Sequence, residues 1–195
     1  SAGTYAGATI NKSVTIKGPN ADVNPNTETR AEEAWFNTQL TIAASNVTLN
    51  GIALTGAGIV KTVADQNIDS LKLVYINVFN STANVGNVSN TAPFDLAVNT
   101  GYTVSNVVLA NSKIACETIK DDRPMIMHAT NIHNLTIDNN SFVGRRVNYN
   151  DAIKLGNGAA VGATGEIVIS NNHFENYAQY LIWFQKYGAV DVLIE

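Results

Sequence analysis

Two short charged stretches of the sequence contain the side chains best suited to chemistry. Only 14% of the residues are Asp, Glu, Lys or Arg, so these stretches hold a large share of the charge of the chain. Arginine side chains bind the acid groups of polysaccharides, and carboxylate side chains accept from sugar hydroxyls, in both cases through charge-assisted hydrogen bonds. We therefore expect a substrate-binding site formed by Asp121, Asp122, Arg123, Arg145, Arg146 and Tyr149.

A polysaccharide lyase would use these side chains in three roles. It needs carboxylates that hold a calcium ion, a lysine or arginine that removes a proton, and an arginine that stabilises the developing charge. Asp121, Asp122 and either Arg123 or Arg145 suit these roles by residue type. A glycoside hydrolase would instead need two carboxylates, about 6.5–9.5 Å apart in an inverting enzyme. The sequence does not supply that distance, so the catalytic residues stay unassigned, and calcium is expected only for a lyase.

The same charged side chains also have a purely structural interpretation, in which they pair with one another on the surface. The apolar pattern aligns Met127 with Leu155 in neighbouring strands. This alignment places Arg123 about 4.8 Å from Asp151, which is the distance between adjacent strands. An exposed ion pair of this kind contributes about 0–1 kcal/mol to stability. Both interpretations stay open at this point.

Aromatic residues near the C-terminus form a second candidate site. Tyr177, Tyr180, Trp183 and Tyr187 lie close together in the sequence. An outward-facing Trp183 would offer a flat apolar surface on which a sugar ring can stack. The alternative is that the cluster packs into the core.

The histidines and the cysteine give no sign of a metal site. His128 and His133 lack the i, i+4 spacing of a helical zinc pair, and His173 belongs to a different repeat. We expect three surface histidines and no bound metal. Cys116 is the only cysteine, so it is expected to be a small buried hydrophobic residue.

These side chains must be positioned by a repeated segment that is clearest at residues 134–143. Its pattern is an apolar residue, any residue, an apolar residue, any residue, then Asn or Gly. Apolar alternation with a period of two is typical of a strand with one buried face. Copies begin at Val14, Val47, Leu71, Val107, Leu135, Ile167 and Val192.

Further strand-like segments lie between successive copies, so each repeat should contain two or three short strands. Four of them are at 94–98, 125–127, 152–155 and 180–184. Residues at the same place in each copy should stack in a buried column: Leu49, Leu73, Leu109, Ile137 and Ile169. Asn111, Asn139 and Asn171 also share one place, which predicts an asparagine ladder that hydrogen-bonds along the stack. On this basis we expect Asn139→Ala to destabilise the fold by about 1–3 kcal/mol.

With these repeats, residues 8–195 resemble the right-handed parallel β-helix proteins of the pectate-lyase-like superfamily. The segment from Gly3 to Gly56 is similar to the first coils of large secreted bacterial surface proteins. The resemblance implies an all-β solenoid of about six to seven coils. It says little about activity, because the same scaffold carries lyases, hydrolases, adhesins and phage tailspikes.

Composition limits the possible partners. The net charge of -4 gives no basic surface for nucleic acid, and no apolar run is long enough to span a membrane. We expect a single domain over residues 1–195 that is a fragment of a longer chain. Neighbouring domains or self-association should then cover the two ends of the coil.

Two functional classes follow from the sequence. The first is a non-catalytic extracellular, cell-surface or virion-surface segment that acts as a rigid scaffold, an adhesin or a unit that binds cell-surface glycans. The second is a polysaccharide lyase or glycoside hydrolase acting on an acidic polysaccharide.

Overall fold

The chain forms strands arranged in three parallel sheets. The computed structural model describes residues 1–81, 92–115, 123–144, 150–156, 162–177, 180–185 and 187–195. No helix among these residues is long and apolar enough to cross a membrane.

Each sheet collects one set of strands from along the chain. The first sheet contains β1 (Gly3–Tyr5), β4 (Ala34–Phe36), β7 (Ala53–Gly56), β11 (Asn77–Ser81), β14 (Lys113–Ala115), β17 (Ser141–Val143) and β20 (His173–Glu175). The second sheet contains β2 (Thr9–Ile10), β5 (Leu40–Ile42), β8 (Val60–Thr62), β12 (Phe94–Ala97), β15 (Arg123–Thr130), β18 (Asn150–Leu155) and β21 (Ile182–Phe184). The third sheet contains β3 (Val14–Lys17), β6 (Val47–Asn50), β10 (Leu71–Val74), β13 (Val104–Ala110), β16 (Ile132–Asp138), β19 (Ala163–Ser170) and β22 (Tyr187–Ile194), with β9 (Ile68–Asp69) paired to β13.

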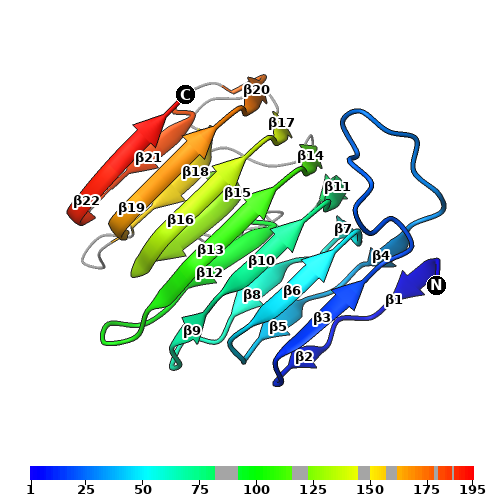
Figure 1. Ribbon diagram of the computed structural model, residues 1–195, viewed down its shortest axis with the longest axis horizontal. Helices are drawn as coiled ribbons and strands as arrows, with labels where there is room; N and C mark the ends of the chain where they lie inside the picture. Colours follow the sequence, from blue (N-terminus) through cyan, green and yellow to red (C-terminus); the bar gives the residue numbers. More distant parts are fainter. Residues whose placement is uncertain (82–91, 116–122, 145–149, 157–161, 178–179, 186) are drawn as a thin grey trace.

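Over the described residues, the chain visits the three sheets in the same order seven times, which makes seven stacked coils. Every strand pairs in parallel with the equivalent strand of the next coil. Figure 1 shows the coils stacked along the long axis, from the blue N-terminal coil to the red C-terminal coil. The predicted all-β parallel β-helix is therefore confirmed, with its number of coils at the upper end of the expected range.

The core consists of columns of apolar side chains that run along the stack. The predicted column is confirmed, because register pairs join its members in order: Leu49, Leu73, Leu109, Ile137 and Ile169. All five are almost completely buried. Full burial of a Leu or Ile side chain contributes about 1.5–3 kcal/mol, so this column supplies a large part of the stability.

The corner between the third and first sheets has a left-handed backbone in five successive coils. The residues there have φ between 52° and 68°: Gly51, Tyr75, Asn111, Asn139 and Asn171. Asparagine tolerates this conformation better than most residues. The Asn139 amide donates to Asn111 Oδ1 over 2.7 Å, whereas the Asn171 amide donates to Asp138 Oδ1 over 2.8 Å. Asn139 and Asn171 are exposed, so this column lies on the surface.

The buried part of the ladder lies one residue further along the chain. Asn140 Oδ1 accepts from the Ser112 backbone N–H over 2.9 Å, and Asn172 Oδ1 accepts from the Asn140 backbone N–H over 3.0 Å. The Asn140 amide also donates to the Leu109 carbonyl over 3.0 Å. Asn140 and Ser112 are buried. These bonds satisfy the backbone groups that the bend withdraws from the sheets.

A long connection between β3 and β4, residues 18–33, lies against the same corner of later coils (Figure 1). The Asn26 amide donates to the Ser112 carbonyl over 3.1 Å. Nearer its start, the Asn50 amide donates to Asp22 Oδ1 over 2.9 Å. The connection therefore links the first coil to the corner that follows β13.

A buried ion pair fixes the end of this connection. Arg30 Nε and Nη2 donate to the two carboxylate oxygens of Glu33 over 2.7 and 2.9 Å. Asn20 and Asn77 donate to the same carboxylate. Burial raises the pKa of Glu33, but the hydrogen bonds from Arg30, Asn77 and Asn20 lower it by more, so the pKa lies below its ordinary value.

Candidate functional site

One column of side chains on the outer face of the second sheet brings charged, imidazole and aromatic groups together. We call it the outer column, and register pairs join its members in order: Thr41, Lys61, Asp95, His128, Lys154 and Trp183. Each lies between residues that face the core, as Asp95 lies between the buried Phe94 and Leu96. Alternation along a strand therefore turns the column outward.

Three members of the outer column form a charged cluster. Lys61 Nζ lies 3.1 Å from Asp95 Oδ2, and His128 Nδ1 lies 3.1 Å from Asp95 Oδ1. Asp95 and His128 are buried, while the Lys61 side chain is 39% exposed. Asp95 thus uses one oxygen for each neighbour, and the Lys61 ammonium compensates the charge of a carboxylate that is otherwise shielded from water.

His128 has one nitrogen with no hydrogen-bond partner. Its Nδ1 donates to Asp95, because a carboxylate oxygen can only accept. Nε2 is buried and has no partner. The expectation that His128 is a surface histidine is therefore wrong: the strands place it against Asp95 of the preceding coil. His133 and His173 are exposed.

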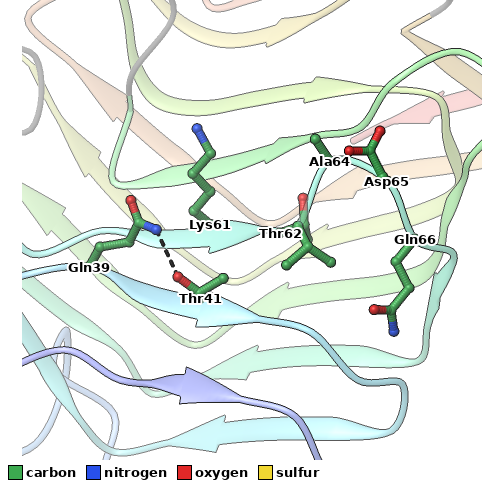
Figure 2. A pocket seen from close by; sticks show the side chains of 8 residues that line it. Gln39, Thr41, Lys61, Thr62, Ala64, Asp65 and Gln66 are labelled. Atoms are coloured by element: carbon green, nitrogen blue, oxygen red, sulfur yellow. Dashed lines mark hydrogen bonds between the residues drawn. The ribbon is translucent and has the colours of Figure 1, made fainter.

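Two shallow depressions meet at Lys61. The first, shown in Figure 2, has a volume of about 360 Å³ and is lined by Gln39, Thr41, Lys61, Thr62, Val63, Ala64, Asp65 and Gln66. The second has a volume of about 320 Å³ and is lined by Lys61, Ala64, Ala97, Val98, Asn99, Thr100, His128 and Thr130. Figure 2 shows Lys61 extending from its strand, with Asp65 and Gln66 on the turn that follows. Lys61 and Ala64 line both depressions, so the two are adjacent, and we call this adjacent pair the groove.

The far end of the outer column is aromatic. The Trp183 and Tyr180 rings lie 5.9 Å apart, and Lys154 Nζ lies 4.8 Å from the centre of the Trp183 ring. Tyr180 is 48% exposed and Trp183 is partly exposed. Trp183 therefore belongs to the outer face of the second sheet.

The predicted charged site falls mostly outside the described residues. Asp121, Asp122, Arg145, Arg146 and Tyr149 lie there. Their two stretches precede β15 and β18 in the chain, and both of these strands belong to the second sheet.

Arg123 begins β15, and the predicted alignment of this strand with β18 is wrong by one residue at Arg123 and by two at Met127. Met127 pairs with Ile153 instead of Leu155, and Arg123 pairs with Asn150. The register shifts between Pro124 and Met127. A bulge of this kind takes up an extra residue, and a proline cannot donate to the ladder. The expected alignment of Arg123 with Asp151 is therefore wrong, because Asp151 pairs with Pro124.

The described residues contain no group of three His, Cys, Asp or Glu side chains that could hold a metal ion. A scan against protein-family models and searches of curated proteins and of solved structures find no match to the chain. The geometry of the outer face therefore carries the functional proposal.

Proposed function

We propose that this protein is a β-helix segment that holds a glycan-binding face in a fixed position at a cell or virion surface. The observation that carries the proposal is the outer column, which leads from a polar groove at Thr41 to an aromatic platform at Trp183. The proposal includes membership of the pectate-lyase-like superfamily of right-handed β-helices. Parallel coils with asparagine at their corners support that membership.

The shape of the outer face suits an extended chain better than a small compact ligand. The six residues of the outer column lie on adjacent strands about 4.8 Å apart, so the column extends over about 24 Å from Thr41 to Trp183. The groove is shallow and lined by hydroxyl and amide side chains, which hydrogen-bond to sugar hydroxyls. From β5 to β18, each strand of this sheet pairs with a neighbour on either side, so binding along this part requires little ordering of the protein.

The aromatic platform adds a contact that needs no charge. A tryptophan ring presents an apolar face, and the C–H faces of a sugar ring can pack against it. The Trp183 ring packs beside the Tyr180 ring, and Lys154 Nζ lies 4.8 Å from its centre. This arrangement supports a role in binding rather than in catalysis.

A catalytic alternative is favoured by one observation, the pair of Asp95 and His128. An imidazole that is oriented by a carboxylate can act as a general base. However, Asp95, His128 and the His128 Nε2 atom are all buried in this structure. We therefore rank the polysaccharide lyase or hydrolase second, with calcium as a cofactor only in the lyase case.

The proposal is tested by binding to an array of immobilised glycans, followed by tryptophan fluorescence titration with the chains that bind. The protein contains two tryptophans, which provide a matched pair of variants. Trp183→Ala should weaken binding at least tenfold, because it removes the platform. Trp35→Ala, in β4 of the first sheet, should bind like the wild type. Equal loss in both variants, or no binding by the wild type, would contradict the proposal.

A further inference from the structure

We propose that the groove around Lys61 selects a neutral, hydroxyl-rich glycan and discriminates against uronic acid chains. This inference rests on the proposed glycan-binding function and adds the chemical class of the ligand. It is carried by the charges and hydrogen-bond partners of the residues that line the two depressions.

The first step concerns charge. Lys61 is the one cationic Lys or Arg side chain among the residues that line the two depressions. Its ammonium lies 3.1 Å from the buried carboxylate of Asp95, whose second oxygen is held by His128. An anionic sugar would have to compete with a carboxylate that is already in place and cannot leave the strand. The positive charge of Lys61 is therefore not available to attract a uronate.

The second step concerns repulsion. Asp65 lines the first depression and is exposed. It is held in place by the Asn99 amide, which donates to Asp65 Oδ1 over 2.6 Å. A uronate in the groove would face this carboxylate, and like charges that are close together destabilise a complex. The charged groups that the structure describes at the groove thus disfavour an anionic ligand.

The third step concerns hydrogen bonding. Gln39 donates an amide N–H to Thr41 and Asn99 donates one to Asp65, and each of these amides also has a carbonyl oxygen that can accept a hydrogen bond. Sugar hydroxyls supply donors to such groups without adding charge. A neutral glycan satisfies these acceptors, directly or through a bound water.

The test compares neutral and uronic acid chains of equal length on the same array, first with the wild-type protein, which needs no substitution. We expect neutral chains to bind at least tenfold more tightly than uronate chains. Asp95→Asn removes the charge that compensates Lys61, so it should shift this ratio at least tenfold in favour of uronates. Asp191→Asn makes the same chemical change at an exposed position in β22 and should leave the ratio unchanged. Thermal unfolding of each variant shows whether it is folded.

The outcomes separate the two proposals. Tighter binding of uronate chains by the wild type overturns this inference and leaves the glycan-binding function standing. Binding of neither class overturns the proposed function and the inference together. A neutral preference that persists in a folded Asp95→Asn protein also overturns the inference, because charge compensation would then not determine the selectivity.

Discussion

Neighbouring asparagines at one coil corner have different tasks. Asn139 adopts a left-handed backbone on the surface, with φ 53°. Asn140 is buried and uses its side chain to bond the backbone of adjacent turns. The first task depends on backbone conformation, and the second depends on an amide group.

Substitutions at this corner should separate the two tasks. Asn139→Ala should cost about 1–2 kcal/mol, because alanine is strained in the left-handed region. Asn139→Gly should restore most of that loss, because glycine adopts positive φ without strain. Asn140→Ala should cost about 1–3 kcal/mol by leaving buried backbone groups unpaired, and Asn140→Gly should not restore it. Urea unfolding measures all four free energies. A glycine rescue at both positions, or at neither, would refute this division.

Glu33 should make stability depend on pH. Its pKa in the folded state is lowered, so its contribution to stability is complete above the unfolded-state pKa and is lost as pH falls through the folded-state pKa. We expect the free energy of unfolding to decrease below about pH 4.5, near the ordinary value for glutamate.

Glu33→Gln tests this directly. It should cost about 3–5 kcal/mol at neutral pH, because Arg30 would keep a buried charge without its partner. It should also make stability less dependent on pH in the acid range. The exposed neighbour provides the control, and Glu32→Gln should change neither property. Identical pH profiles for Glu33→Gln and the wild type would contradict the role of this carboxylate.

At the scale of the element, the central strands should matter more than those at the end. Leu109→Ala in β13 removes a fully buried side chain with a coil on either side, so it should cost about 2–5 kcal/mol. Ile16→Ala, in the first coil of the same column, should cost less because Ile16 is only partly buried. Urea unfolding of the two variants provides the comparison. An equal cost at both positions would mean that the stacking order does not determine stability.

The strands and the core column could be predicted from the sequence because their signal is local. Alternation identifies which residues face inward, and equivalent places in the repeat identify which of them stack. The register between neighbouring strands is harder to predict, because a slip of two residues keeps every side chain on the same face of the sheet. The apolar pattern therefore fits an alignment of Met127 with Leu155 as well as the observed pairing with Ile153, and it does not reveal the bulge near Pro124.

The candidate site was largely missed for a related reason. Lys61, Asp95 and His128 come from three different coils, and each is an ordinary polar residue within its own strand. Only the combined registers of β8, β12 and β15 bring them together. A signal was nevertheless present, because each follows an apolar residue at the same place in the second strand of its coil: Val60, Phe94 and Met127. Trp183 was found because aromatic residues cluster around it in the sequence.

For the whole molecule, the binding and catalytic proposals differ in one product. A lyase acting on pectate or alginate with calcium would form an unsaturated sugar that absorbs in the near ultraviolet. We expect no increase in absorbance, because Asp95 and His128 are buried and already engaged with each other. An increase that His128→Ala abolishes and His173→Ala preserves would establish the catalytic alternative.

The central claim is that a glycan lies along the outer face of the second sheet. The most direct measurement is a crystal structure of the protein with an oligosaccharide selected by the array. We predict electron density for sugar rings over the groove at Lys61 and on the ring of Trp183, aligned with the stacking direction of the coils. Sugar bound instead at Trp35 on the first sheet, with the outer column free of ligand, would contradict the claim.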